Sequence, residues 1–427
     1  MESTDDSVDV ALFDMVLSLS RAIDLLHPAI CEHHLRVAYA SGCIGEALGL
    51  SADAVQDLVV AGALHDIAAV CAPSSRSLLD RALRYYGGDN SDFEDVHAHA
   101  RDGNLILRDF PPFAQAAAAI RFHHVDWCDG SGAWRRGEQV PLASHILRIA
   151  DRLAVLPCDG RPILSQKYAI QQAVREGRGS LFVPALVDAF EAVSARDVFW
   201  LDLVGKHKES TLRRRFGGTA IRLDLDGLYA LAKMFARIID YRSSFTALHS
   251  SRVAEASELL ATRLELPANG VRLIGVAGYL HDIGKLSIPT ALLDKPGRLT
   301  DEEMLLIRQH PYYTREILCP VPGLETVSMW ASYHHERLDG AGYPFRPQHL
   351  PTEARIVAVA DVYTALTEDR PYRRGMEKAD CFRVLDGMVS GGALDGDIVA
   401  LLRTAYDALP DDRGNTGGEL AGRALHA

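Results

Sequence analysis

The sequence of 427 residues lacks any run of about 18 apolar residues, the length that a membrane-spanning helix requires. It also begins with an acidic stretch, from Met1 to Asp6, where a secretory signal would be basic. Hydrophobic residues make up 48% and charged residues 24% of the chain, which is typical of an ordinary globular protein. We therefore expect a cytoplasmic protein without a membrane partner.

Cysteine pairs and an excess of positive charge are also missing. The seven cysteines are scattered without a C-x-x-C pair, which argues against a disulfide framework and against a zinc ribbon. The net charge of -12 disfavours a protein that binds duplex nucleic acid, because such a protein presents a positive face to the phosphates. A small anion remains a suitable ligand where cations are gathered locally.

Strand signals are few, whereas apolar residues recur at helical spacing along most of the chain. Thr300 followed by Glu303 predicts a capping box at the start of one helix. Further helices are expected over 246–266, 271–282, from about Glu325 to His334, and over 354–367. The length allows two or three domains. We predict an all-α fold.

Histidines stand at unusual places in this helical pattern. His334 and His335 are adjacent and run into a turn that contains Gly340, Gly342 and Tyr343. Consecutive imidazoles are costly to bury unless their nitrogens find partners, and a metal ion can serve several at once.

The histidine pattern occurs twice. The interval from a histidine to the next His-Asp pair is 32 residues in each half (33 to 65 and 249 to 281), and a later interval is 24 (99 to 123 and 310 to 334). The first set is His33, His65, Asp66, His99, His123, His124 and Asp151; the second is His249, His281, Asp282, His310, His334, His335 and Asp361. This agreement predicts two tandem helical domains, over 12–196 and 228–408, with a connection at 197–227 and a flexible tail at 409–427.

Five imidazoles and two carboxylates in the second set are too many ligands for one ion. Mixed nitrogen and oxygen ligands suit Fe, Mn, Co, Ni or Zn rather than Ca or Mg. A shared carboxylate would hold two divalent ions about 3.5–4 Å apart, an arrangement suited to phosphoester hydrolysis. We therefore expect two divalent transition-metal ions in the second domain.

The second half resembles the HD-GYP family of HD phosphohydrolases, which are bacterial cyclic dinucleotide phosphodiesterases with an all-α fold. The resemblance covers nearly all of 235–408. It includes His249 to Val253, His281 to Lys285, Lys295 to Gly297, His310-Pro311, His334 to Pro344, Asp361 and Asp369 to Arg373. By this resemblance one ion is held by His249, His281, Asp282 and Asp361, and Asp282 bridges to a second ion held by His310, His334 and His335.

The resemblance also implies substrate-binding residues. Lys285 would reach the scissile phosphate, while Arg370 and Arg373 would clamp the second phosphate or its ribose. Gly342 would let the backbone approach the site, and Tyr343 would either pack against a base or hold its loop.

Two further positions refine this expectation. Glu336 is expected to orient an imidazole, or else to accept a proton. Some family members carry a glutamate four residues before the first histidine and hold a third ion with it. Phe245 stands there in this chain, so we predict two ions in the second domain and not three.

The first half keeps the seven ligand-type residues but loses the substrate set. Ala69 stands where Lys285 stands, Val125 replaces Glu336, and Leu164 falls where Arg373 would be. We interpret this half as a degenerate HD domain that regulates the second half or supports a homodimer. Its histidines either form a second metal site or are relics satisfied by hydrogen bonds in the core.

Together these observations predict an enzyme that hydrolyses a 3′,5′-cyclic dinucleotide to a linear dinucleotide, and further to mononucleotides if a second bond is cut. Cyclic di-GMP is the first candidate substrate and cyclic GMP-AMP the second. The alternatives are a generic HD nucleotidase acting on monoesters and a nucleotide-sensing adaptor without catalytic activity.

Overall fold

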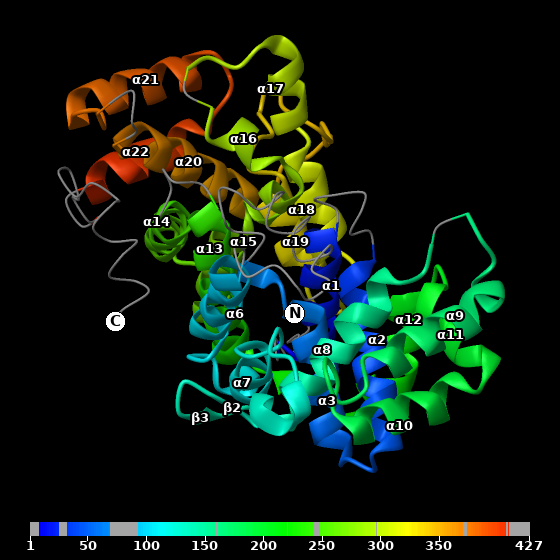
Figure 1. Ribbon diagram of the computed structural model, residues 1–427. Coiled ribbons are helices and arrows are strands. Elements are labelled where there is room, and N and C mark those ends of the chain that lie inside the picture. Colours follow the sequence, from blue (N-terminus) through cyan, green and yellow to red (C-terminus); the bar gives the residue numbers. More distant parts are fainter. Residues whose placement is uncertain are drawn as a thin grey trace. The chain divides into compact units, whose positions relative to one another are not determined.

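The computed structural model describes residues 8–24, 32–68, 93–158, 160–219, 221–242, 248–295, 297–369, 374–406 and 409. The chain forms two compact units. The N-terminal unit is Leu12–Ile221, and the C-terminal unit consists of Arg222–Ala427 together with Met1–Ala11. Helices dominate both units and the strands are only two residues long (Figure 1), so the prediction of an all-α fold is confirmed.

The N-terminal unit is built from α-helices, short 3-10 helices (η) and one two-stranded ribbon, β2–β3. Its elements are α1 (Leu12–Asp24), α2 (His33–Ala47), α3 (Ala52–Leu64), α6 (Phe93–Leu107), η3 (Pro111–Phe113), α7 (Ala114–Ile120), η4 (Cys128–Ala133), β2 (Trp134–Arg135), β3 (Glu138–Gln139), α8 (Leu142–Val155), α9 (Ile163–Glu176), α10 (Pro184–Ser194), α11 (Asp197–Val204), α12 (Lys208–Phe216) and η5 (Gly217–Thr219).

Helix α2 is central to this unit, since α3, α8, α10 and α12 all pack against it. A glycine permits the closest of these approaches. A Cβ atom at Gly62 of α3 would lie only 2.7 Å from the Cα atom of Ala38 in α2. The two helix backbones therefore meet with nothing between them, and this crossing fixes the positions of the residues that begin α2 and follow α3.

The segment predicted as a connection, 197–227, is largely helical. It contains α11 and α12, which belong to the N-terminal unit, and this unit extends to Ile221. Leu212 and Phe216 are buried, and a Cβ atom at Gly42 of α2 would lie 2.6 Å from the ring of Phe216. Arg214 and Arg215 are exposed on α12, while the helix packs against α2. The boundary between the units therefore differs from the predicted one.

The C-terminal unit contains the second set of helices and a ribbon of two strands that are distant in sequence. Its elements are β1 (Val10–Ala11), β4 (Arg222–Leu223), α13 (Leu225–Arg242), α14 (His249–Arg263), α15 (Ala268–Leu280), η6 (Ile283–Ser287), α16 (Thr290–Leu293), α17 (Asp301–Ile307), α18 (His310–Leu318), α19 (Glu325–Ser332), α20 (Thr352–Thr367), α21 (Lys378–Ser390) and α22 (Gly396–Ala405). The predicted tail, 409–427, lies outside the described residues apart from Leu409.

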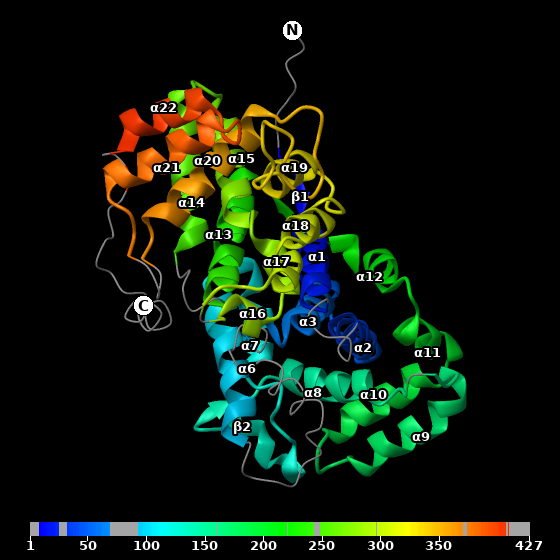
Figure 2. The same ribbon diagram turned by 90° about the horizontal axis from the view of Figure 1, so that it is seen from above.

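Helix α14 packs against α15 and α20 (Figure 2). The crossing of α14 and α15 repeats the one between α2 and α3, because a Cβ atom at Gly278 would lie 2.7 Å from the Cα atom of Ala254. The predicted capping box is confirmed: Thr300 and Glu303 each accept a hydrogen bond from the backbone N–H of the other. Helix α19 ends at Ser332, so the two adjacent histidines lie in the turn that follows it.

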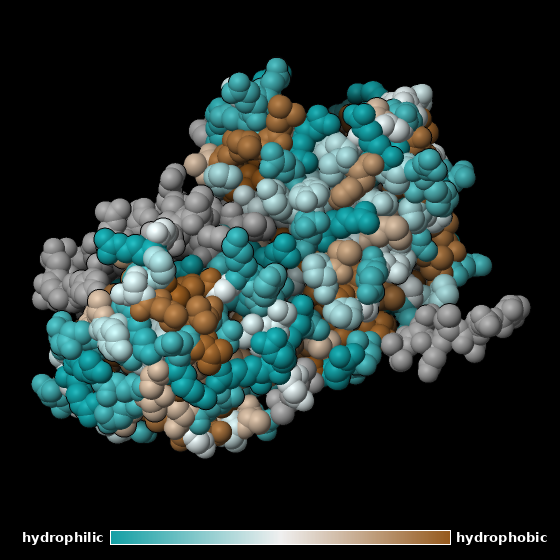
Figure 3. All heavy atoms as spheres, turned by 90° about the vertical axis from the view of Figure 1, so that its right-hand side faces the viewer, coloured by the Kyte–Doolittle hydropathy of each residue, from teal (hydrophilic) through white to brown (hydrophobic). Residues whose placement is uncertain are grey.

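Hydrophobic side chains on the face shown in Figure 3 are divided into several patches by hydrophilic ones. Among the described residues, none of the helices combines the length and the apolar character needed to cross a membrane.

Candidate metal centre

The structure brings all seven predicted ligands of the C-terminal unit together. Most lie at helix ends, where chain turns converge: His249 begins α14, His310 begins α18, and His281 directly follows α15. Asp361 is the exception, in the middle of α20. Six of the seven residues are buried, whereas the side chain of His335 is 29% exposed.

The carboxylate of Asp282 lies between two groups of ligand atoms. Its Oδ2 atom is 3.2 Å from Nε2 of His281, and its Oδ1 atom is 3.3 Å from Nε2 of His310. On the first side, Nε2 of His249 lies 3.2 Å from Oδ1 of Asp361. The ligand atoms of three residues on the second side, His310, His334 and His335, all lie within 4.8 Å of one another. Two clusters that share one carboxylate are the arrangement expected of a two-ion site.

Backbone carbonyl groups orient three of these imidazoles. The Nδ1 atom lies 2.7–2.8 Å from the carbonyl oxygen three residues earlier in His281, His310 and His334. Because a carbonyl only accepts, Nδ1 carries the proton and Nε2 keeps a lone pair that points into the cluster. The Nε2 atom of His281 has no hydrogen-bond partner among the described residues. A buried lone pair without a donor fits a metal ligand.

A buried glutamate orients the remaining histidine of the first group. Oε2 of Glu368 lies 3.0 Å from Nδ1 of His249. Burial opposes a charged imidazole, but hydrogen bonds to Asp361 and Glu368 raise the pKa of His249 to about 10. An incoming ion would therefore displace a proton from His249. The sequence interpretation missed Glu368, although its spacing of seven residues from Asp361 places both on one face of a helix.

The protonation states of His310, His334 and Asp282 are also those that bind a metal ion. Burial lowers the pKa of His310 to about 3, and burial with neighbouring imidazoles holds the pKa of His334 well below its usual range. Burial alone would raise the pKa of Asp282, but His281 and Lys285 keep it well below its usual range. Neutral imidazoles and an ionised carboxylate are the forms that coordinate a metal.

The loop after His335 encloses one side of the site. The ring of Tyr343 packs on that of His335, with 4.9 Å between centroids, and the guanidinium carbon of Arg308 lies 4.3 Å from the centroid of the Tyr343 ring. Gly342 packs against the backbone at the start of the same loop, since a Cβ atom there would lie only 2.6 Å from the backbone nitrogen of Arg337. Gly342 therefore shapes the loop, and Tyr343 contacts a predicted ligand.

Glu336 holds this loop rather than an imidazole. Its Oε1 atom accepts hydrogen bonds from the backbone N–H groups of Phe345 at 2.7 Å and Arg346 at 3.1 Å. Among the described residues Glu336 makes no hydrogen bond to a histidine, so the expected role as an imidazole orienter was wrong. Lys285 does reach the ligand cluster: its Nζ atom donates to Oδ2 of Asp282, and its side chain is 27% exposed.

The N-terminal unit also brings its seven residues together. They lie at the start of α2 (His33), after α3 (His65, Asp66), in α6 (His99), after α7 (His123, His124) and in α8 (Asp151). Nε2 of His33 is 3.4 Å from Oδ1 of Asp151, and Nε2 of His65 is 3.3 Å from Oδ2 of Asp66. The other three histidines gather around Oδ1 of Asp66.

Comparison with known proteins identifies both units. The HD domain family matches the chain twice, over residues 233–398 and 30–156. A relative from Vibrio cholerae serotype O1 named 3′3′-cGAMP-specific phosphodiesterase 1 is 31% identical over 93% of this chain and 92% of its own length. The chain belongs to the HD-GYP family of cyclic dinucleotide phosphodiesterases.

Two further HD-GYP comparisons differ in how much they cover. The crystal structure of a cyclic GMP-AMP specific phosphodiesterase of Vibrio cholerae, V-cGAP3, has a TM-score of 0.62 and 25% identity, covering 95% of this chain and all of that one. A cyclic di-GMP phosphodiesterase of Pseudomonas aeruginosa is 43% identical, but over 33% of this chain and 34% of its own length. The prediction of two tandem HD domains is confirmed.

The loop that follows His335 also lines a cavity of about 610 Å³, through Tyr343, Pro344 and Arg346. Its walls come from α17, α18 and the loop, and include Leu305, Arg308, Gln309, Tyr312, Tyr343 and Arg346. The sequence interpretation did not single out Arg308 or Arg346, because neither belongs to a ligand motif. Arg370 and Arg373, the predicted phosphate clamp, lie outside the described residues, as does Phe245.

Proposed function

We propose that this chain hydrolyses 3′3′-cyclic GMP-AMP, with cyclic di-GMP as the second candidate substrate. The cluster centred on Asp282 supports hydrolysis, because two ligand groups share one carboxylate. The named relatives that match the whole chain, both repeats included, act on cyclic GMP-AMP, whereas the cyclic di-GMP enzyme matches only a third of it. This difference in coverage is the observation that favours the mixed nucleotide.

Two divalent ions fit the residues present in the C-terminal unit. The first ion would be held by His249, His281, Asp282 and Asp361, and the second by Asp282, His310, His334 and His335. When bound, such ions supply a water that loses its proton near neutral pH, and they stabilise the charge that develops on the phosphoryl oxygens. Backbone carbonyl groups hold the protons of His281, His310 and His334 on Nδ1, so the Nε2 lone pairs of these three residues would be available to the ions.

Lys285 would bind the scissile phosphate. Its ammonium group donates to Asp282, so it lies at the boundary between the ligand cluster and solvent. A phosphate oxygen arriving there would accept a second N–H group from the same Nζ atom, since an ammonium carries three donors. Because Ala69 stands at this place in the first repeat, we place catalysis in the C-terminal unit alone.

The cavity beside Tyr343 would take a nucleobase. Arg308 and the exposed Tyr312 line it with a guanidinium group and an aromatic ring, groups that stack on purines without requiring one particular base. A nucleoside monoester would need only the ligand cluster and one phosphate site. The extended cavity therefore favours a dinucleotide over the substrate of a generic nucleotidase, and the partly exposed Lys285 favours an enzyme over an adaptor.

The test is product analysis with protein reconstituted with Mn²⁺ or Fe²⁺. Wild-type protein should convert 3′3′-cyclic GMP-AMP to a linear dinucleotide faster than cyclic di-GMP, and a nucleoside monophosphate hardly at all. Asp282→Asn should lower turnover by roughly 100-fold or more, because the shared ligand loses its charge. Asp188→Asn, on the exposed surface of α10, is the control and should change nothing. Unchanged turnover in Asp282→Asn, or faster cleavage of the monophosphate, would contradict the proposal.

A further inference from the structure

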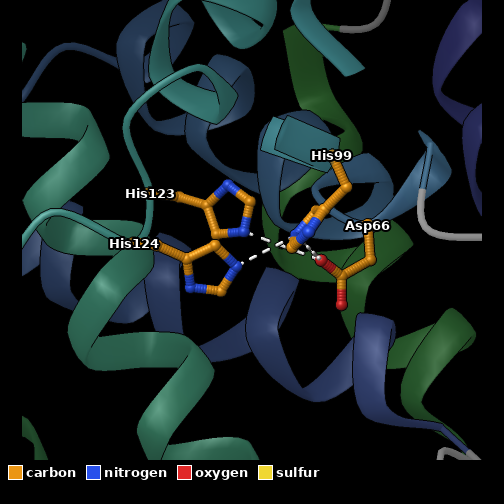
Figure 4. A group of neighbouring side chains, drawn as sticks. All are labelled: Asp66, His99, His123 and His124. Atoms are coloured by element: carbon orange, nitrogen blue, oxygen red, sulfur yellow. Dashed lines mark hydrogen bonds and ion pairs between the residues drawn. The ribbon is translucent and has the colours of Figure 1, made fainter. Parts of the chain in front are cut away.

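Four ligand-type side chains converge in the N-terminal unit. Figure 4 shows Asp66, His99, His123 and His124 directed toward one point. Oδ1 of Asp66 lies 3.1 Å from Nε2 of His99 and 3.6 Å from Nε2 of His123, and the Nε2 atoms of His99 and His124 are 2.9 Å apart. All four side chains are at least nine-tenths buried.

Hydrogen bonds within the core do not satisfy this cluster. Nε2 of His123 and Oδ1 of Asp66 make no hydrogen bond among the described residues, and the 3.6 Å between them is beyond hydrogen-bond reach. In a tetrahedral zinc site, metal–ligand distances of about 2.0–2.1 Å place neighbouring ligand atoms roughly 3.3 Å apart. The observed spacings lie around this value, so one ion fits between the four atoms. Hydrogen bonds among the described residues leave the buried Nε2 of His123 unsatisfied, which the relic interpretation does not explain.

The remaining ligand-type residues of the N-terminal unit, around Asp151, differ from this cluster because a cationic side chain, Arg152, already lies among them. Nη2 of Arg152 lies 2.9 Å from Oδ2 of Asp151, and both side chains are buried. The equivalent position in the second repeat is Val362, which carries no charge. A guanidinium group thus neutralises the carboxylate that a metal ion would otherwise need.

The N-terminal unit also has no counterpart of Glu368, the carboxylate that supports His249, at the equivalent position near His33. Cys158 stands where Glu368 stands in the second repeat. Glu368 is buried and hydrogen-bonded to His249, whereas Cys158 is exposed and its thiol lies against the carbonyl oxygen of Leu156. A carboxylate partner raises the basicity of a metal-bound imidazole and fixes its ring, and His33 lacks one at this position.

We propose that the N-terminal unit holds a single divalent transition-metal ion, between Asp66, His99, His123 and His124, and that Arg152 replaces the second ion. Three imidazoles and one carboxylate match the preference of zinc. Four buried protein ligands fill a tetrahedral shell and leave no position for substrate, so this ion is structural. It cross-links α6 to the turns that follow α3 and α7.

The experiment counts and locates ions in the full-length chain. Metal per chain is measured by mass spectrometry, and anomalous scattering in crystals at the metal absorption edge locates each ion. Wild-type protein should show one N-terminal peak, centred among the four residues. His123→Ala should lose that peak and keep the C-terminal ones. An empty cluster in wild-type protein, or a second peak beside His33, would overturn the proposal.

A gain-of-site variant tests the role of Arg152 without removing any ligand. Arg152→Val with Cys158→Glu installs the residues of the second repeat, and it should add one ion per chain, located beside His33. Cys158→Ser is the matched control and should keep the wild-type number. If the double variant folds and gains no ion, Arg152 does not stand in for a metal.

Discussion

Glu368 shows how one residue outside the ligand set controls a ligand. Its carboxylate lies 3.0 Å from Nδ1 of His249 and both side chains are buried. The carboxylate holds a proton on Nδ1, so Nε2 faces Asp361, 3.2 Å away, and becomes free to bind a metal when an incoming ion displaces its proton. Glu368 therefore positions His249, which would hold the first of the two proposed ions.

We predict that Glu368→Gln weakens metal binding by about 10-fold or more, since the imidazole loses a charged partner and becomes less basic. Turnover measured against free Mn²⁺ concentration should shift to higher metal, and excess metal should restore most of the maximal rate. Glu302→Gln, on the exposed surface of α17, should leave the metal dependence unchanged. A lowered maximal rate with an unshifted metal dependence would contradict a positioning role.

Residues differ in how well the sequence predicts them. The fourteen ligand-type residues could be found because their intervals repeat in the two halves of the chain. The roles of Glu336, Arg308 and Arg152 could not be predicted, because they depend on how loops and side chains fold back in three dimensions. Arg152 follows Asp151 directly, yet only its conformation in α8 reveals that it neutralises that carboxylate.

At the scale of elements, each unit depends on one close helix crossing. Gly62 lies against Ala38 between α3 and α2, and Gly278 against Ala254 between α15 and α14. The two helix backbones of each pair are too close for a methyl group. Both glycines stand three residues before a ligand histidine, so the crossing also sets the position of His65 or His281.

We predict that Gly278→Ala destabilises the C-terminal unit by about 1–3 kcal/mol through overpacking, despite the better helix propensity of alanine. Denaturant unfolding measures the change, and metal content should fall as His281 shifts. Gly387→Ala is the matched control: Gly387 is exposed in α21 with no atom near the added methyl group, so it should stabilise by up to about 1 kcal/mol. Equal effects of the two substitutions would contradict the crossing argument.

The helices with strong apolar periodicity were predictable, and so was the capping box at Thr300. The helix α12 was not, because Arg213, Arg214 and Arg215 mask the buried face formed by Leu212 and Phe216. The strands β1 and β4 were also missed. A two-residue strand has no periodicity of its own, and only the distant partner defines it.

At the scale of the whole molecule, the C-terminal unit is assembled from two separate stretches of chain. Val10 pairs with Leu223 and Ala11 with Arg222 in the antiparallel ribbon β1–β4. Val10 is fully buried. The unit in which we place catalysis therefore includes a segment that precedes the whole first repeat.

We predict that Val10→Asp destabilises the C-terminal unit by about 2–4 kcal/mol, because it buries a charge and removes apolar contacts. Thermal inactivation of turnover should occur at a lower temperature in the full-length variant. Asp9→Asn is the control. Asp9 precedes Val10 and is exposed, and the substitution leaves the backbone unchanged, so it should have little effect. Inactivation of Val10→Asp at the wild-type temperature would show that the ribbon contributes little.

The β1–β4 ribbon also affects the order in which the protein can be completed during synthesis. Val10 and Ala11 leave the ribosome early, but their partners, Arg222 and Leu223, follow more than two hundred residues later. At roughly 5–20 residues per second, the first strand waits on the order of 10–40 s. During that time the N-terminal repeat can fold, so translation delivers the repeat that lacks a counterpart of Lys285 first and the repeat in which we place catalysis last.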